Sequence, residues 1–221
     1  MEALSITVGG ERVSGLLLRP EGAKALYLFA HGAGVGMNHP SMATNAEGLA
    51  ARGIATLRYQ FPYMEKGGGR PDSPRIAQAT VLAAAGAAGE VAPDLPLFAG
   101  GRSYGGRMTS QAQATAPLPG VRGLAFLGFP LHPPGAPGFS RAVHLERVNV
   151  PMLFVSGDRD ALADADLLKS TVAGLGERAT LHLISGGDHG LRVLVKSGRT
   201  NEEAQTEALD TLAAWMLRLA Q

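Results

Sequence analysis

The sequence contains no cysteine and carries almost no net charge. Its 221 residues include 20 Lys or Arg and 19 Asp or Glu residues, which leaves a formal charge of +1. Without cysteine, a disulfide-stapled scaffold and a thiol nucleophile are both excluded. The balanced charge gives no reason to expect nucleic acid or an acidic membrane surface as a partner.

The sequence also lacks a long apolar segment. The most apolar stretch, residues 76–92, is rich in alanine, is interrupted by Gln78, Thr80 and Glu90, and is too short for a convincing membrane span. The first residues show no basic region followed by an apolar run, so no secretory signal peptide is expected. These absences favour a cytoplasmic protein in which residues 76–92 form a core-facing helix.

Short β-branched or aromatic runs alternate with longer helical patterns along the chain. The runs 4–8 and 15–18 flank Gly9-Gly10 and predict an antiparallel hairpin. The alternation that follows predicts a mostly parallel sheet with helices on both faces. Because one α/β domain commonly spans about 200–250 residues, we expect residues 1–221 to form a single domain. Further strands are expected at 25–30, 54–59, 95–100, 123–129, 152–156 and 180–184, a surface loop at 61–72, and helices at 41–52, from Ser73-Pro74 onward, at 104–116, at 163–175 and at the C-terminal end.

The segment Gly101-Arg102-Ser103-Tyr104-Gly105 follows an expected strand and precedes an expected helix. A serine on such a tight turn projects its hydroxyl above the sheet edge, and glycines two residues before and after it let the backbone approach itself closely. The N-terminus of the following helix favours a developing negative charge. Ser103 is therefore the candidate nucleophile, although the same residues also suit a glycine-rich turn with a serine N-cap.

Two further candidates follow late strands of the expected sheet. In the loop 157–160, Asp160 fits the common G-x-x-D pattern better than Asp158, which is kept as the alternative. His189 lies in a short glycine-rich loop after the last expected strand, which suits a mobile general base. Because each candidate follows a strand, Ser103, Asp160 and His189 are expected at the same sheet edge.

The order Ser103, Asp160, His189 is that of an α/β-hydrolase triad. Over nearly its whole length the chain resembles the small, lid-poor α/β-hydrolases of the dienelactone-hydrolase-like group, and within it a poorly characterised branch, some members of which are complex subunits rather than enzymes. Dienelactone hydrolase itself uses a cysteine nucleophile, and this chain departs from it at Ser103. The motifs that carry the resemblance are HGAG with the nearby His39-Pro40, GRSYGG, FPLHPP at 129–134, GDRD and GGDHG.

The resemblance implies an α/β-hydrolase fold and a serine hydrolase that cleaves small carboxylic esters or thioesters through an acyl-enzyme, without a cofactor. It places the oxyanion-binding N–H groups on Ala33 and Tyr104, with Gly34 as the alternative to Ala33, and gives His31 a structural role within its loop. The connection 131–150 is too short for a large helical lid, so an open site is expected.

Two other function classes fit parts of the sequence. The main alternative is a non-catalytic interaction module on the same scaffold. A nucleotide-binding Rossmann protein fits less well, because the glycines after residues 25–30 do not match G-x-G-x-x-G. No metal site is expected, since His39, His132 and His144 lack metal-ligand spacing. Peptidase activity and the oligomeric state are left open.

Overall fold

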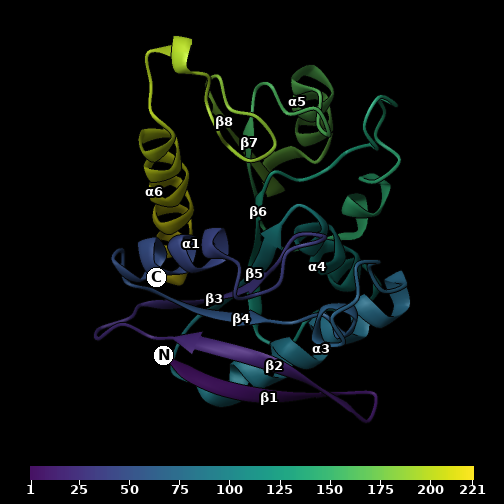
Figure 1. The fold of residues 1–221 in the computed structure, drawn as a ribbon, viewed down its shortest axis with the longest axis vertical. Coiled ribbons are helices and arrows are strands. Elements are labelled where there is room, and N and C mark those ends of the chain that lie inside the picture. Colours follow the sequence, from purple (N-terminus) through teal and green to yellow (C-terminus); the bar gives the residue numbers. More distant parts are fainter.

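The computed structural model describes residues 1–221 and contains one eight-stranded sheet, with the strands in the order β1-β2-β4-β3-β5-β6-β7-β8 (Figure 1). The hairpin of β1 (Glu2–Val8) and β2 (Glu11–Leu18) is antiparallel, and β2 also pairs antiparallel with β4. Every other neighbouring pair is parallel, so the predicted sheet architecture is confirmed. The remaining strands are β3 (Ala25–Ala30), β4 (Ile54–Tyr59), β5 (Leu97–Arg102), β6 (Val121–Leu127), β7 (Met152–Gly157) and β8 (Ala179–Ile184).

Helices cover both faces of this sheet. All six residues of β3 are buried, and its side chains alternate between two apolar clusters, as the two-residue period of a strand requires. Leu26 and Leu28 face the cluster of α3, α4 and α5, whereas Tyr27 and Phe29 face the cluster of α1 and α6. The helices are α1 (Pro40–Ala50), α2 (Pro62–Glu65), α3 (Pro74–Val91), α4 (Tyr104–Thr115), α5 (Ala165–Gly174) and α6 (Asn201–Ala220), with short 3-10 helices at Val143–Arg147 (η1), Gly176–Arg178 (η2) and Val195–Ser197 (η3).

The apolar stretch at residues 76–92 lies in α3, as expected. Alanine and valine side chains of α3, including Ala77, Val81 and Ala84, are buried against the sheet, so this stretch is apolar because it packs in the core. None of the helices combines the length and the apolar character needed to cross a lipid bilayer.

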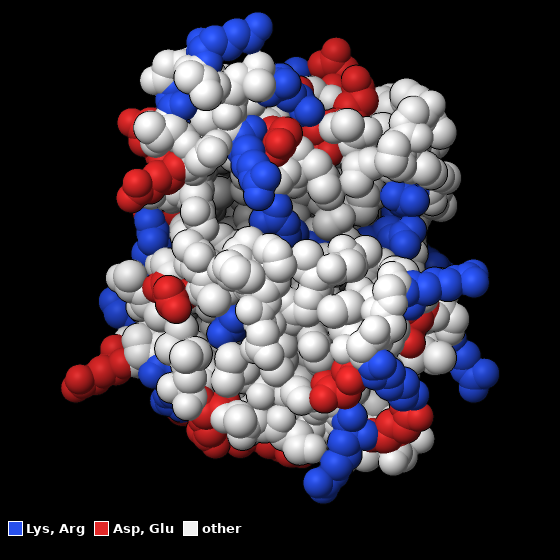
Figure 2. Space-filling view, viewed as in Figure 1, with Lys and Arg blue, Asp and Glu red and all other residues white.

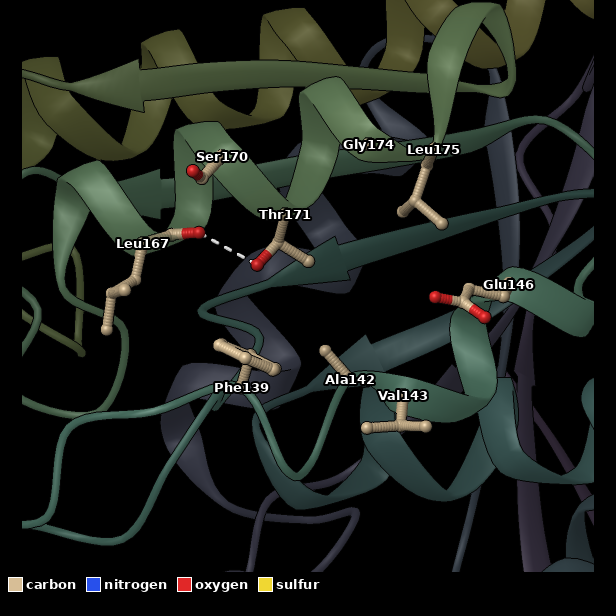
Figure 3. Close-up of a pocket in the computed structure, with 9 residues that line it drawn as sticks. All are labelled: Phe139, Ala142, Val143, Glu146, Leu167, Ser170, Thr171, Gly174 and Leu175. Atoms are coloured by element: carbon tan, nitrogen blue, oxygen red, sulfur yellow. Dashed lines mark hydrogen bonds between the residues drawn. The ribbon is translucent and has the colours of Figure 1, made fainter.

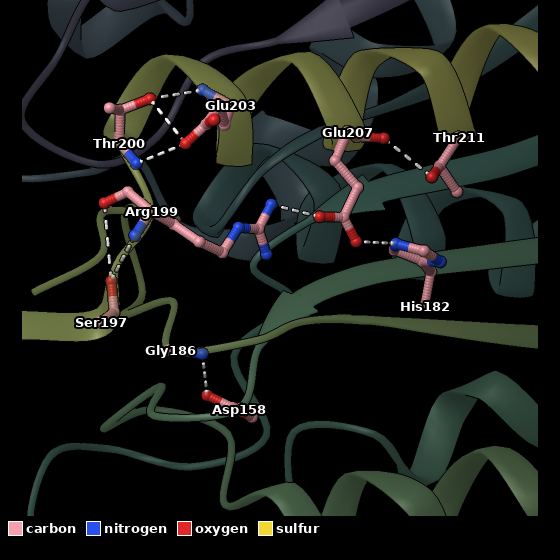
Figure 4. Close-up of polar contacts among 9 residues, drawn as sticks. All are labelled: Asp158, His182, Gly186, Ser197, Arg199, Thr200, Glu203, Glu207 and Thr211. Atoms are coloured by element: carbon pink, nitrogen blue, oxygen red, sulfur yellow. Dashed lines mark hydrogen bonds and ion pairs between the residues drawn. The ribbon is translucent and has the colours of Figure 1, made fainter.

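The N-terminus of α6 is fixed by a capping box. Thr200 Oγ1 accepts a hydrogen bond from the backbone N–H of Glu203 at 3.1 Å, and the Glu203 carboxylate accepts one from the Thr200 N–H at 2.7 Å (Figure 4). These contacts lower the pKa of Glu203. One turn later, Glu207 accepts hydrogen bonds from Arg199 and from His182 of β8. The segment that leads from β8 into α6 is therefore anchored at its helical end.

Two local predictions are wrong. The expected loop at 61–72 contains the one-turn helix α2, in which Pro62 stands at the first position, where its missing N–H costs nothing. Tyr63 of this helix is buried, so packing stabilises a turn that the local Pro and Gly content does not indicate. Ser73 precedes α3 as expected, but its side chain makes no capping hydrogen bond.

The connection between β6 and β7 contains only the short helix η1. No lid stands over the carboxyl ends of the strands in the structure, as the length of the connection 131–150 predicts.

Candidate active site

Ser103 stands on the turn between β5 and α4. Its φ of 48° and ψ of −115° are a backbone conformation that side-chain-bearing residues rarely adopt. The turn packs closely against the carboxyl end of β3, because a Cβ on Gly101 would lie 2.4 Å from the Ala30 carbonyl oxygen and one on Gly105 would lie 2.5 Å from that of His31. The glycines that flank Ser103 are thus required by backbone contact, and the strained turn holds the hydroxyl at the sheet edge.

Because of this close approach, adding a single methyl group at Gly105 should lower the stability of the fold markedly. We expect Gly105→Ala to lower the free energy of unfolding by about 1–3 kcal/mol, because the new Cβ overlaps rigid backbone. Gly89→Ala is the matched control: Gly89 lies in α3 with nothing within 4 Å of its Cβ position, so that variant should be stabilised by about 0.5–1 kcal/mol. Urea unfolding measures both, and equal shifts of the same sign would contradict the backbone argument.

The structure brings together the three residues that the sequence places after separate strands. His189 Nε2 lies 2.8 Å from Ser103 Oγ, and His189 Nδ1 lies 2.8 Å from Asp160 Oδ2 and 2.9 Å from Oδ1. A carboxylate at Nδ1 fixes the proton on that nitrogen, which leaves Nε2 free to accept the proton of the serine hydroxyl. Ser103, His189 and Asp160 therefore form one continuous hydrogen-bonded chain, the arrangement that an activated serine requires.

The two aspartates of the loop after β7 have different partners. Asp158 Oδ1 accepts a hydrogen bond from the backbone N–H of Gly186 at 2.8 Å and does not contact His189 (Figure 4). Asp160 is buried, and its Oδ1 also accepts the Leu162 N–H at 2.7 Å. Of the two alternatives, the geometry pairs Asp160 with the imidazole.

The two candidate oxyanion donors lie beside Ser103. Tyr104 is the first residue of α4, so its N–H has no partner within the helix. The N–H of Ala33 donates to no group of the protein, whereas that of Gly34 donates to the hydroxyl of Tyr63 at 3.3 Å. Because Ala33, Ser103 and Tyr104 line the same cavity, the geometry favours Ala33 over Gly34 as the second donor.

His31 lies beneath this loop and is fully buried. Its Nδ1–H donates to the Gly32 carbonyl at 2.8 Å, and its Nε2 accepts the backbone N–H of Phe61 at 3.1 Å. Burial lowers the pKa of His31 to about 4. The ring therefore joins two loops in its neutral form, and this arrangement agrees with the structural role expected for it.

The buried His31 and the half-buried His144 predict that the stability of the fold depends on pH in the acid range. The unfolded chain protonates His31 near the ordinary pKa of 6.5, whereas the folded chain keeps it neutral down to about 4. Burial lowers the pKa of His144 to about 4 as well. Since the unfolded state binds more protons in this interval, the free energy of unfolding should fall as the pH drops from about 6.5 to about 4.

Denaturant unfolding at several pH values measures this dependence. The slope between pH 4 and pH 6.5 should be smaller in His31→Gln and in His144→Gln than in the wild type, because each variant removes one proton-binding group from the unfolded state. The exposed His39 supplies the control variant His39→Gln. If the slope were unchanged in both His31→Gln and His144→Gln, the lowered pKa values of these two histidines would be contradicted.

A cavity of about 340 Å³ opens beside Ser103. Its walls are mostly apolar, but two guanidinium groups, those of Arg107 and Arg141, also line it. Burial lowers the pKa of Arg107, and the positive charge of Arg141 lowers it further. A second hollow lies between η1 and α5, is lined by Phe139 and Val143 among others, and contains no triad residue (Figure 3). Of these two cavities, only the one beside Ser103 could hold a small molecule next to the candidate nucleophile.

No motif in the sequence indicates that these two arginines line a cavity beside Ser103. Arg107 lies on α4, four residues after Ser103. Because residues four apart share one face of a helix, this spacing could have indicated that Arg107 lies on the same side as Ser103. Arg141 lies in the Pro- and Gly-rich connection after β6, where no local pattern predicts its position.

The other histidines have structural partners. His39 caps α1 by accepting the Ser41 N–H, and His132 contacts the Pro133 carbonyl and the backbone N–H of Asp164. The structure contains no group of three or more His, Cys, Asp or Glu side chains arranged to hold a metal ion. Asp164 itself caps α5, as an aspartate at a helix start commonly does.

The family to which this chain belongs follows from its similarity to known protein families. The family described as "Alpha/beta hydrolase domain" matches residues 23–217. The chain belongs to this family. The fold expected for an α/β-hydrolase without a lid is thereby confirmed, together with the resemblance on which that expectation was based.

Several solved structures of other proteins share the fold of this α/β-hydrolase, although their sequences are only distantly similar to it. Dienelactone hydrolase from Anabaena variabilis is 23% identical, with a TM-score of 0.76 over 98% of this chain and 96% of that one. A lid-less α/β serine hydrolase from Xanthomonas campestris is 19% identical, with a TM-score of 0.74 over 97% and 94%. The esterase domain of a Rhodothermus marinus protein is 19% identical, with a TM-score of 0.72 over 98% of each chain.

Proposed function

We propose that this α/β-hydrolase is a serine hydrolase that cleaves small carboxylic esters or thioesters through an acyl-enzyme on Ser103. The observation that carries the proposal is the continuous hydrogen-bonded chain from Ser103 Oγ through His189 to Asp160. The names of similar structures, which include a serine hydrolase and an esterase domain, support the reaction class. The cavity of about 340 Å³ favours a small substrate, since it lies at the lower end of the usual range for ligand pockets.

Acylation begins when His189 Nε2 takes the proton of the Ser103 hydroxyl while Oγ attacks the carbonyl carbon of the substrate. Asp160 holds the imidazole in the required tautomer and stabilises its charged form. The carbonyl oxygen becomes an oxyanion that accepts hydrogen bonds from the N–H groups of Ala33 and Tyr104. Each such donor contributes about 3–4 kcal/mol to transition-state stabilisation.

The tetrahedral intermediate then collapses and expels the alcohol or thiol, which receives its proton from His189. A water molecule replaces the leaving group, loses a proton to His189 and attacks the acyl carbon on Ser103. A second oxyanion forms between the same two N–H groups. Its collapse releases the carboxylic acid and returns the proton to Ser103 Oγ.

A fluorophosphonate probe tests the proposal directly, because it forms a stable adduct only with an activated serine. We expect the wild type to be labelled at Ser103, identified by mass spectrometry of the modified peptide, and Ser103→Ala to remain unlabelled. A panel of short-chain esters and thioesters then defines the acyl specificity. If the folded wild type is neither labelled nor active on the panel, the non-catalytic interaction module becomes the better hypothesis.

A further inference from the structure

A third cavity, of about 200 Å³, is lined in part by the residues that follow His189. It is enclosed by α1, by the first turns of α6, by the ends of β5 and β6, and by residues 190–192. Most of its lining is polar, and no carboxylate takes part in it. The residues that matter for the argument are Ser41, Asn45, Arg102, Arg192, Asn201 and Gln205.

Arg102 is the most unusual residue of this cavity. It ends β5, one residue before Ser103, and its guanidinium group makes no hydrogen bond or ion pair with the protein. Burial lowers the pKa of Arg102, and the positive charge of Arg192 lowers it further. A half-buried guanidinium group without a protein partner is unfavourable, because it has lost part of its hydration and has gained no hydrogen bond in return. An anion in the cavity would supply the missing acceptor.

The nearby carboxylate of Asp188 does not fill this role. It raises the pKa of Arg102 through its charge, but its Oδ1 is engaged by the backbone N–H groups of Gly190 at 2.7 Å and Arg192 at 2.9 Å. It therefore holds the turn after His189 and lies outside the cavity lining. The two arginines remain without a carboxylate partner.

Two amide side chains of the lining offer further donors. The side-chain oxygen of Asn45 accepts a hydrogen bond from Gln205, and that of Asn201 accepts one from the backbone N–H of Val193. Both amide NH₂ groups are thus left without an acceptor in the protein. Asn201 is also the first residue of α6, so its own backbone N–H has no partner within the helix, whereas the Glu203 N–H is taken up by the capping box.

We propose that this cavity binds a phosphate-type oxyanion between Arg102 and Arg192. The planar guanidinium fork matches the oxygens of a phosphoryl group in a bidentate fashion. Figure 2 shows blue Lys and Arg side chains in the hollow that crosses this face of the molecule, so an anion meets positive charge on its approach. The anion is either free phosphate or a phosphoryl group carried by the ester substrate.

The position of the cavity couples it to the triad. A Cβ on Gly190 would lie 3.3 Å from an Arg102 guanidinium nitrogen, so this group packs against the residue that follows His189. Arg102 also directly precedes the nucleophile. An anion held by Arg102 therefore contacts both segments that carry the proposed base and nucleophile.

Calorimetric titration with inorganic phosphate tests the site without any need for enzymatic activity. We expect saturable binding to the wild type and to Arg12→Gln, a control in which an exposed arginine of β2 loses its charge far from the cavity. Binding should weaken at least about tenfold in Arg102→Gln and in Arg192→Gln, since each removes charge-assisted hydrogen bonds. Thermal unfolding without phosphate verifies that each variant is folded, and the exposed Arg192 provides the variant least able to disturb the core.

The proposal is overturned if the folded wild type shows no saturable phosphate binding, or if all three variants bind as the wild type does. The ester pair monoacetylglycerol and acetylglycerol 3-phosphate assigns the source of the anion. If the wild type prefers the phosphorylated ester and Arg102→Gln loses this preference, the site binds the phosphoryl group of the substrate. If added phosphate instead changes the hydrolysis of both esters equally, the site binds free phosphate. Because the titration does not depend on ester cleavage, failure of the proposed serine chemistry leaves its result interpretable.

Discussion

Replacing Ser103 with alanine should reduce ester turnover at least about 10⁴-fold while leaving the fold intact. The variant removes the oxygen that forms the acyl bond, and only the oxyanion donors and substrate binding then remain. The Ser103 side chain makes one hydrogen bond, to His189 at 2.8 Å, so little packing is lost. The measurement is kcat/KM for p-nitrophenyl acetate, with the thermal unfolding midpoint recorded for the same preparation.

Ser170→Ala is the matched control for this prediction. Ser170 is an exposed serine of α5 that lines the hollow between η1 and α5, away from the triad. Its replacement should change kcat/KM by less than about twofold, as expected of a surface substitution with little effect on the fold. If Ser103→Ala retained the wild-type turnover, a different nucleophile would have to be sought.

Replacing Asp160 with asparagine should lower kcat by about 10⁴-fold with little change in geometry. The carboxylate accepts the Nδ1–H of His189, whereas an asparagine NH₂ group facing Nδ1 would donate to it. The proton of the neutral imidazole would then stand on Nε2, which could no longer accept the proton of Ser103. The variant should therefore bind substrate but acylate slowly, a difference that single-turnover measurements resolve.

The neighbouring aspartate offers a control of identical chemistry. Asp158→Asn keeps an oxygen for the hydrogen bond from Gly186, and it should leave kcat within about twofold of the wild type because Asp158 does not contact His189. The opposite pattern, with Asp158→Asn inactive and Asp160→Asn active, would assign the orienting role to Asp158.

The positions of the buried strands could be predicted, because a strand buried on both faces is a continuous apolar run in the sequence, whichever elements it packs against. The strands at 25–30 and 54–59 have the predicted bounds, since each is a run of residues buried on both faces. The helix α2 was missed because its stability comes from packing and not from its own four residues. Local pattern thus predicts elements that carry the core, and misses short ones that depend on it.

The candidate site follows the same rule. Ser103 and His189 were predictable because each lies in a glycine-rich turn after a strand, where a parallel sheet collects side chains at one edge. The sequence left Asp158 and Asp160 open as alternatives, because the choice depends on contacts with His189 and Gly186, which lie nearly thirty residues further along the chain. Such contacts between distant segments leave no mark in a local motif.

The anion cavity was not predictable for a related reason. In the sequence Arg102 belongs to the turn around Ser103, and no pattern links it to Arg192 or to the start of α6. These groups meet because the final helix packs beside α1 on the face that carries Tyr27 and Phe29. A pocket built from separate elements becomes visible only once their packing is known.

The short connection between β6 and β7 has a kinetic consequence. With only η1 in this connection, no cover has to swing aside before a substrate reaches Ser103 or a product leaves it. Gating motions limit turnover in many enzymes whose sites must open and close. We therefore expect the proposed ester cleavage to be indifferent to solvent viscosity and to need no lipid–water boundary to begin.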